Sequence, residues 1–231
     1  MIEKLLPHGV AVVEAFEDVP RELSFPGEES LVANAVEARR REFITARRCA
    51  REALAKLGYA PVPIRAGRKR EPLWPAGLVG SITHTTGFRA AAVASRSVLA
   101  SIGIDTEQND RLPEGVEESI TVPEEPEMLA ALSRAFPATH WGRLLFSAKE
   151  SVYKAWYPLT GRGLGFEDAR LAIDPVGTFA AKLLVDGART DGGLPLVELR
   201  GRFIVARGLV ATAVTVPSAY ADACVYRKPK P

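Results

Sequence analysis

A stretch without glycine or proline, residues 144–156, constrains the fold of this chain most strongly. Its apolar residues recur at helical spacing: Leu144, Leu145, Val152 and Trp156. This spacing predicts an amphipathic helix that runs to about residue 156. Glu150 and Lys154 are four residues apart, so the helix carries a carboxylate and an ammonium group on one face.

A second segment, residues 98–105, has the alternation of a β-strand, because Ile102 and Ile104 alternate with Gly103 and Asp105. A strand sends residues two apart to the same side, so Asp105 and Glu107 point the same way. With Glu150 from the helix, three carboxylates could converge on one cation, with Lys154 beside them. Magnesium prefers oxygen ligands and usually keeps waters and substrate phosphates among them. The sequence therefore predicts a magnesium site, formed by Asp105, Glu107 and Glu150, that handles a phosphate ester.

Charge is distributed unevenly along the chain. Residues 39–71 contain 11 Lys or Arg and 3 Asp or Glu, whereas residues 105–127 contain 9 Asp or Glu and 1 Arg. Two solvated faces would explain this pattern, and so would a polyanion-binding region next to an acidic metal site. The acidic block and the lack of interleaved aromatic residues argue against nucleic acid as the partner.

The basic region begins with a predicted long helix, residues 28–57, ending at Gly58 as a natural C-cap. Arg39 and Arg47 lie largely off its apolar stripe and differ in direction by roughly 80°. They can therefore serve one ligand, although an arginine-lined helix is also typical of a solvated surface.

A loop over residues 61–75 follows, rich in proline, glycine and charge. Gly67 would let its backbone approach a ligand closely, and Arg68 and Lys69 would favour an anionic one. A flexible basic loop without a ligand explains the composition equally well. In the polar turn predicted at residues 80–85, His84 stands beside Thr83 and is a candidate donor to a phosphate, although a lone histidine is usually structural.

The remaining patterns predict an α+β fold, possibly in two lobes, because strand, long helix and strands occur in residues 1–104 and again in 100–216. Expected strands are residues 9–16, 89–95, 169–173, 179–185, 196–199 and 202–216, an irregular acidic segment is 109–126, and a short helix is 127–135. The basic residues 227–231 are expected to form a disordered tail.

Composition indicates a soluble cytoplasmic protein, with 47% hydrophobic and 25% charged residues. Cys49 and Cys224 provide no spacing for a metal site or a disulfide framework. The N-terminal segment is too polar for a signal peptide, and no apolar run approaches the roughly 20 residues that span a bilayer.

Four motifs, taken in order, resemble those of a known family. They are Arg-Glu-Pro at residues 70–72, Gly-Ser-Ile-Thr-His-Thr at 80–85, Gly-Ile-Asp-Thr-Glu at 103–107 and Phe-Ser-Ala-Lys-Glu-Ser-Val-Tyr-Lys at 146–154. Their order and spacing are similar to the 4'-phosphopantetheinyl transferases of the Sfp type, and within these to the enterobactin-synthase branch. The resemblance runs from about Arg39 to Asp168. Thr83 stands where many relatives have serine, and Phe146 where many have tryptophan; neither change is expected to abolish activity.

This resemblance implies two similar lobes, each a small sheet with a long helix, related by a pseudo-two-fold axis. The expected boundaries are residues 1–100 and 101–226, with coenzyme A in the cleft between the lobes and Mg²⁺, or possibly Mn²⁺, as the cofactor. The implied reaction transfers 4'-phosphopantetheine from coenzyme A to a serine of an apo acyl or peptidyl carrier protein, which leaves adenosine 3',5'-bisphosphate. A monomer without nucleic-acid or membrane partners is expected.

Site residues follow from the same resemblance. The catalytic candidates are Glu150 as proton acceptor, Lys154 as stabiliser of phosphoryl charge, and His84. The expected contacts to coenzyme A are Arg39, Arg47, Gly67, Arg68, Lys69, Thr83, His84, Asp105, Lys149, Glu150 and Lys154. Two other functions fit the residues alone: a magnesium-dependent nuclease or phosphatase, and a non-catalytic module that binds an acidic partner.

Overall fold

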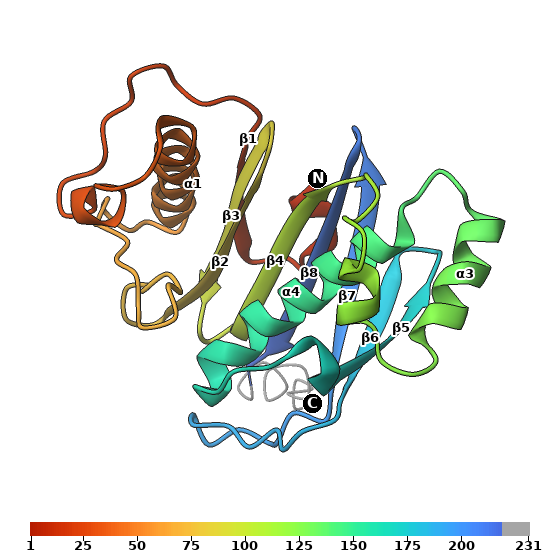
Figure 1. Ribbon diagram of the computed structural model, residues 1–231. Helices are drawn as coiled ribbons and strands as arrows, with labels where there is room; N and C mark the ends of the chain where they lie inside the picture. Colours follow the sequence, from red (N-terminus) through yellow and green to blue (C-terminus); the bar gives the residue numbers. More distant parts are fainter. Residues whose placement is uncertain (219–231) are drawn as a thin grey trace, which may run out of the picture.

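The computed structural model describes residues 1–218 of the 231-residue chain. Within them the strands form two antiparallel sheets, each packed against a long helix (Figure 1). The strand orders are β1-β3-β2 and β4-β8-β7-β6-β5. This is the α+β architecture that the sequence predicts. No helix of the described part of the chain is long and apolar enough to cross a membrane.

The three-stranded sheet comprises β1 (Val10–Ala15), β2 (Leu78–Thr85) and β3 (Phe88–Ser95). Helix α1 (Glu37–Lys56) covers one face, where Cys49, Ala50, Ala53 and Leu54 pack against Ala91 and Val93 of β3. Alanine on both sides of this contact lets the helix backbone lie close to the sheet.

The five-stranded sheet comprises β4 (Leu99–Gln108), β5 (Ala169–Asp174), β6 (Thr178–Leu183), β7 (Glu198–Ala206) and β8 (Leu209–Pro217). Helix α4 (Trp141–Thr160) covers one face with its apolar stripe, which includes Leu144, Val152 and Trp156. Two shorter helices, α2 (Val116–Ile120) and α3 (Glu125–Ala135), precede it.

A third apolar layer lies between the two sheets, on the faces that α1 and α4 do not cover. Ile102 and Ile104 of β4 pack there with Ala90 and Ala92 of β3, and the 3-10 helix η1 (Ile2–Leu5) contributes Ile2. At the seam, β2 and β4 lie side by side (Figure 1), and the Ile104 N–H donates to the Ser81 hydroxyl at 3.1 Å. The arrangement leaves α1 and α4 on either side of this seam.

The predicted helix over residues 28–57 is wrong in its first third. Residues 29–31 form only a 3-10 turn, η2 (Glu29–Leu31), and α1 begins at Glu37. The reason is a long-range ion pair: the buried Glu28 carboxylate accepts from Arg51 at 2.8 Å and from the Ile64 N–H at 2.7 Å. The end of the helix is as predicted, since Gly58 adopts φ +83° immediately after the C-cap.

Three further predictions change in detail. Residues 80–85 are part of strand β2 rather than a polar turn. The predicted strand 202–216 is two strands, β7 and β8, because Arg207 and Gly208 adopt φ +56° and +71° and reverse the chain. The acidic segment 109–126 is not wholly irregular, since it contains α2 and the start of α3.

Helix α4 extends beyond residue 156 to Thr160, with Pro158 in its last turn and Gly161 as a left-handed C-cap. The predicted tail at residues 227–231 lies outside the described residues.

Candidate functional site

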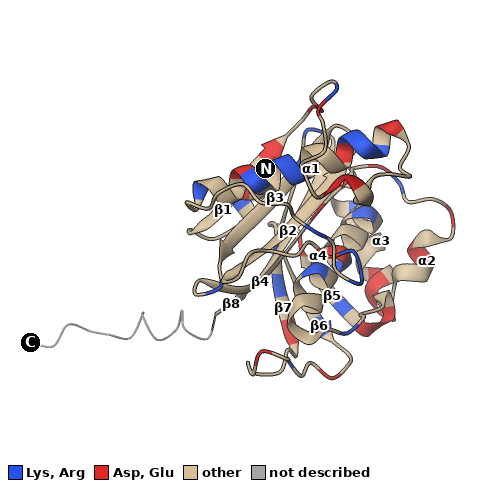
Figure 2. Cartoon of the chain, turned by 90° about the vertical axis from the view of Figure 1, so that its left-hand side faces the viewer, with Lys and Arg blue, Asp and Glu red and all other residues tan. Residues whose placement is uncertain are grey.

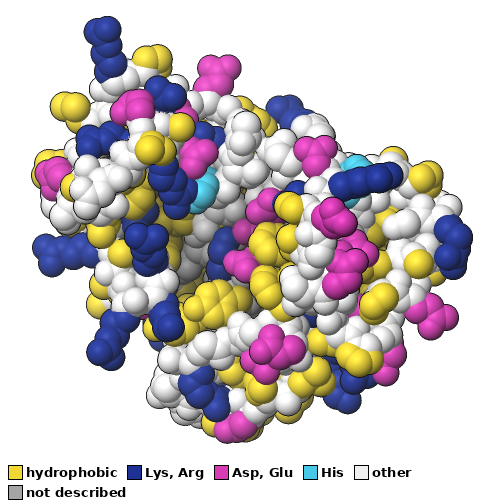
Figure 3. All heavy atoms as spheres, viewed as in Figure 1, with side chains coloured by type: hydrophobic (Ala, Val, Ile, Leu, Met, Phe, Trp, Pro, Cys, Tyr) yellow, Lys and Arg dark blue, Asp and Glu magenta, His cyan; other side chains and the backbone are white. Residues whose placement is uncertain are grey.

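A cavity of about 630 Å³ lies at the seam between the sheets, bounded by α1, the loop around residues 69–74, β2 and α4. Figure 3 shows the groove in which it opens, and in Figure 2 the positions of Lys and Arg are blue along α1 and those of Asp and Glu are red around α2 and α3. The basic segment, residues 39–71, therefore lines the cavity, whereas no residue of the acidic segment 105–127 belongs to its lining.

The α1 wall of this cavity carries two of the predicted arginines, Arg39 and Arg47. Arg47 is buried, donates from Nε to the Ile64 carbonyl at 3.0 Å and stacks over Phe43 at 3.7 Å. Burial lowers the pKa of Arg47 to about 10, so the guanidinium remains charged at neutral pH. Arg39 is exposed and reaches across to His84 on β2. Both arginines therefore face the same space, as their helical offset predicts.

The loop brings Lys69 to the cavity, while Gly67 and Arg68 lie outside its lining. The space beside the Gly67 Cα is taken by the Glu71 side chain, since a Cβ there would lie 1.9 Å from Glu71 Oε1. The Glu71 carboxylate also accepts from the Lys69 N–H at 2.8 Å. The Glu71 side chain thus occupies the space beside Gly67, and the close approach of Gly67 to a ligand stays a prediction.

The two predicted phosphate donors, Thr83 and His84, are adjacent on strand β2, but only one of them lines the cavity. His84 lines the cavity, whereas Thr83 is buried and outside the lining, and its Oγ1 has no hydrogen-bond partner among the described residues. Burial, reinforced by the Arg39 charge, lowers the pKa of His84 to about 4. His84 is therefore neutral at pH 7.

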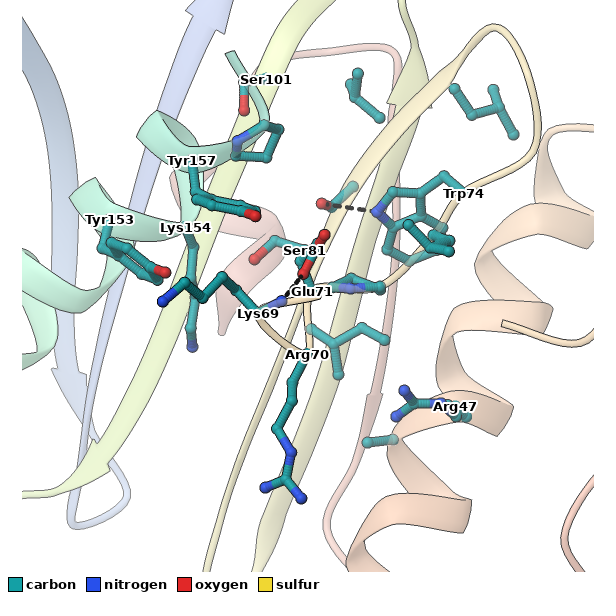
Figure 4. Close-up of a pocket in the computed structure, with 18 of the residues that line it drawn as sticks. Arg47, Lys69, Arg70, Glu71, Trp74, Ser81, Ser101, Tyr153, Lys154 and Tyr157 are labelled. Carbon is teal, nitrogen blue, oxygen red and sulfur yellow. Dashed lines mark hydrogen bonds between the residues drawn. The ribbon is translucent and has the colours of Figure 1, made fainter. Parts of the chain in front are cut away.

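The α4 wall presents four side chains at positions i, i+3, i+4 and i+7: Glu150, Tyr153, Lys154 and Tyr157. The two tyrosine rings lie 6.0 Å apart, and Figure 4 shows both beside Lys154 at the cavity. The sequence analysis identified Glu150 and Lys154 but missed the tyrosines. Their helical spacing from Glu150 is the signal that would have found them.

Close packing of β4 on α4 sets the position of this wall. A Cβ on Gly103 would lie 1.9 Å from the Ser151 carbonyl oxygen, so only glycine permits this approach. As a result the Lys154 ammonium donates to Asp105 Oδ1 at 2.7 Å and to the Ile104 carbonyl at 3.1 Å.

The three predicted metal ligands share one electrostatic environment. Burial, and then repulsion by Asp105, raises the pKa of Glu107; burial and the Asp105 charge raise that of Glu150, against the lowering effect of Lys154. Asp105 pairs with Lys154, and Glu107 lies 3.4 Å from Arg143. Within residues 1–218 no group of three or more His, Cys, Asp or Glu side chains is already arranged to hold a metal ion.

The donor set nevertheless fits a divalent cation. The second oxygen of Asp105, Oδ2, is buried and has no hydrogen-bond partner among the described residues. An oxygen left in this state is costly, and crowded carboxylates repel one another. A hard cation would relieve both, and its preferred ligands are carboxylate oxygens.

Lys149, expected to contact coenzyme A, lies outside the lining of this cavity. Its ammonium is buried and donates to Glu125 at 2.9 Å, to the Ile120 carbonyl at 2.7 Å and to the Phe166 carbonyl at 2.8 Å. All three donors of the group are therefore used inside the protein. Lys149 links α4 to α2, to α3 and to the segment after α4, and it borders a smaller cavity beside Leu164 and Phe166.

Other lining residues were not identified from the sequence, among them Arg70, Trp74, Ser81 and Ser101 (Figure 4). Trp74 donates to the Gly80 carbonyl at 3.0 Å, and the Ser101 hydroxyl is buried without a partner among the described residues. These residues come from separate elements that meet only in the folded protein, so no local sequence pattern predicts that they share a cavity.

Comparison with known proteins shows that a family model matches each half of the chain. The family model "4'-phosphopantetheinyl transferase N-terminal domain" matches residues 27–94, and the model of the 4'-phosphopantetheinyl transferase superfamily matches residues 101–196. The chain is 51% identical over 220 residues to 4'-phosphopantetheinyl transferase Svp of Streptomyces mobaraensis, covering 94% of this chain and 89% of that protein. It is 49% identical over 223 residues to 4'-phosphopantetheinyl transferase Npt of Nocardia iowensis, covering 93% and 99%. Enterobactin synthase component D of Salmonella typhi is more distant, at 41% over 120 residues, or 51% of this chain and 48% of that protein.

Proposed function

The chain belongs to the 4'-phosphopantetheinyl transferase superfamily and transfers 4'-phosphopantetheine to carrier proteins, and we propose that the cavity between α1 and α4 binds the coenzyme A that supplies the group. One observation carries this proposal: a single cavity has Arg39, Arg47 and His84 on one wall and Glu150 with Lys154 on the other, and Lys154 is paired with Asp105, which lies just outside the lining. Coenzyme A has phosphates at two places, the nucleotide 3'-position and the diphosphate. A cavity with two separate sites for phosphate suits such a molecule.

The α1 side is proposed to hold the nucleotide end. Arg39, Arg47 and Lys69 supply positive charge there, and the neutral His84 accepts a hydrogen bond from Arg39 and so orients that guanidinium. Arg47 is held in place by Ile64 and Phe43 before any ligand arrives, which reduces the entropy lost on binding.

The α4 side is proposed to hold the reacting diphosphate. Asp105, Glu107 and Glu150 are the residues that would bind Mg²⁺. When bound, the ion would neutralise charge on the diphosphate oxygens. Lys154 has three N–H donors and uses two, on Ile104 and Asp105, so one remains for an oxygen of the transferred phosphoryl group.

Glu150 is proposed to accept the proton of the attacking serine hydroxyl. It lines the cleft cavity and also a second cavity of about 450 Å³, bounded by Leu164 and Phe166; Tyr153 borders both. A group transferred from one space toward the other would pass Glu150. That position is the reason for assigning it the proton.

The two other functions considered from the sequence, a magnesium-dependent hydrolase and a non-catalytic module, are set aside because the family models matching residues 27–94 and 101–196 are both those of transferases. The proposal also includes a monomeric cytoplasmic enzyme with lobes at residues 1–100 and 101–226. Light scattering after size-exclusion chromatography tests the oligomeric state.

Replacing Asp105 tests the assignment directly. Asp105→Asn should reduce formation of the holo-carrier by at least about a hundredfold, since charge stabilisation by a bound metal is worth several kcal/mol. Mass spectrometry of an apo-carrier incubated with coenzyme A and Mg²⁺ measures this. Asp110→Asn, an exposed carboxylate close by in the sequence, is the matched control and should keep the wild-type rate. A wild-type rate for Asp105→Asn would contradict the proposed metal site.

A further inference from the structure

We propose that Glu42 is a positioning residue that holds Arg39 and His84 in the geometry that recognises the 3'-phosphate of coenzyme A. The inference rests on the proposed function and deepens it: Glu42 would set the preference for nucleotides that carry a 3'-phosphate. Neither the motifs nor the comparisons assign it a role.

Glu42 stands behind the α1 wall of the cavity. Arg39 and His84 line the cavity, and Glu42 does not. One oxygen of its carboxylate, Oε2, lies 3.3 Å from Arg39 Nη1 and 3.5 Å from His84 Nδ1. The carboxylate therefore contacts both side chains from outside the lining of the cavity.

The other carboxylate oxygen is tied to a fixed point in the protein. Glu42 Oε1 lies 3.7 Å from Arg89 Nη2. Arg89 is buried on β3, donating to Asp18 at 2.8 Å and to the Thr85 carbonyl at 2.6 Å. A chain of charges thus runs from Asp18 through Arg89 and Glu42 to the cavity wall.

A carboxylate beside a phosphate site has two effects of opposite sign. Its charge repels a phosphate and weakens binding. It also restrains Arg39, whose side chain is 49% exposed and would otherwise lose rotamer freedom only when the ligand binds. Glu42 restrains two ligand-facing side chains at once, because it contacts both Arg39 and His84. Arg89 is already neutralised by Asp18, so Glu42 is not needed as its counter-ion. We therefore expect the restraint to be the larger effect.

The sign of the change on mutation decides between these effects. Titration calorimetry of Glu42→Ala should show adenosine 3',5'-bisphosphate binding roughly two- to tenfold more weakly than to wild type, the range expected for losing the preorganisation of a long side chain. Binding of AMP, which lacks the 3'-phosphate, should not change. Glu42→Gln keeps a hydrogen-bond acceptor for Arg39 and should recover part of the loss.

Glu52→Ala is the matched control, because Glu52 lies on the same helix, is exposed and, within residues 1–218, forms an ion pair only with Arg48, at 3.0 Å. It should leave both affinities unchanged. In turnover, Glu42→Ala should raise KM for coenzyme A and leave kcat within about twofold of wild type, and it should leave KM for 3'-dephospho-coenzyme A unchanged.

Tighter binding of adenosine 3',5'-bisphosphate by both Glu42 variants would overturn the inference, since repulsion would then be the main effect. The inference would also be overturned if Glu42→Ala kept the wild-type preference for adenosine 3',5'-bisphosphate over AMP. If the wild-type protein itself does not prefer adenosine 3',5'-bisphosphate to AMP, the proposed nucleotide site is wrong, which is a separate result.

Discussion

Substituting Gly103 by alanine tests whether the contact between β4 and α4 builds the reactive side of the cavity. The added Cβ would lie 1.9 Å from the Ser151 carbonyl oxygen and 2.7 Å from the Ala155 nitrogen. Both are backbone atoms inside α4, so no side-chain rotation relieves the clash and the helix must move away from the strand. Overpacking of this kind costs about 1 to 3 kcal/mol, and a clash with backbone falls at the upper end.

For a chain of this size about 3 kcal/mol corresponds to a fall in Tm of roughly 6 to 12 °C. The catalytic loss should exceed the loss of stability, because Lys154 lies one residue from the clash and must stay 2.7 Å from Asp105. A misplacement of about 1 Å at a reacting centre can cost about a hundredfold in rate. Differential scanning calorimetry and holo-carrier formation below the lowered Tm measure the two effects.

Gly163→Ala is the matched control for stability, since a Cβ there meets nothing within 4 Å and the residue does not need a positive φ. Its Tm should equal that of wild type within about 1 °C. If Gly103→Ala also unfolds at the wild-type temperature and transfers the group at the wild-type rate, the close approach of α4 does not position Lys154 and the reasoning fails.

Three other measurements probe single side chains. Lys149→Met should destabilise the protein by about 3 to 5 kcal/mol in urea, because it leaves the buried Glu125 carboxylate unpaired; wild-type stability with a selective loss of coenzyme A binding would contradict this. His84 has a pKa of about 4 when folded and near 6.5 otherwise, so the unfolded state binds more protons between these values. Wild type should therefore lose more stability than His84→Gln as pH falls from about 6.5 to 4 in thermal scans, and parallel curves would refute the assignment. Cys49 is buried with its pKa raised to about 11, so in a Cys224→Ser background iodoacetamide should label it only after denaturation, as mass spectrometry would show; labelling of the native protein would count against the packing of α1.

Local patterns were sufficient for much of the fold. The apolar spacing of residues 144–156 predicted α4, and the alternation around Gly103 predicted β4 with Asp105 and Glu107 on one side. Gly58 marked the end of α1. In each case the signal lies within one element, where periodicity and capping act.

Long-range pairs explain where the sequence predictions were wrong. Nothing near Glu28 indicates that its carboxylate bonds to Arg51 and to the backbone of Ile64, and this pairing keeps residues 29–36 out of the helix. Likewise, the turn at Gly208 divides residues 202–216, whose apolar pattern predicted a single strand.

Lys149 is a different case, because the geometry of helix α4 was enough to predict that it points away from the cleft cavity. Adjacent residues on an α-helix point about 100° apart, so Glu150 lines the cleft cavity while Lys149 does not, although both border the smaller cavity beside Leu164 and Phe166. Membership in a shared motif led to the expectation that both contact coenzyme A. Helix geometry alone separates Glu150, on the cavity side, from Lys149, which faces α2 and α3.

The balance of charge on the α4 side explains why cation and coenzyme should bind there together. Lys154 and Arg143 are paired with Asp105 and Glu107, and among the described residues no ion pair involves Glu150. Three carboxylates against two cationic side chains leave this side with an excess of negative charge, although only Glu150 and Lys154 of the five line the cavity itself, and such an excess repels a diphosphate. The α1 wall carries Arg39 and Arg47 and has the charge to attract the proposed nucleotide end by itself. We therefore propose that binding of the nucleotide end does not depend on a metal ion, whereas binding of the diphosphate on the α4 side does.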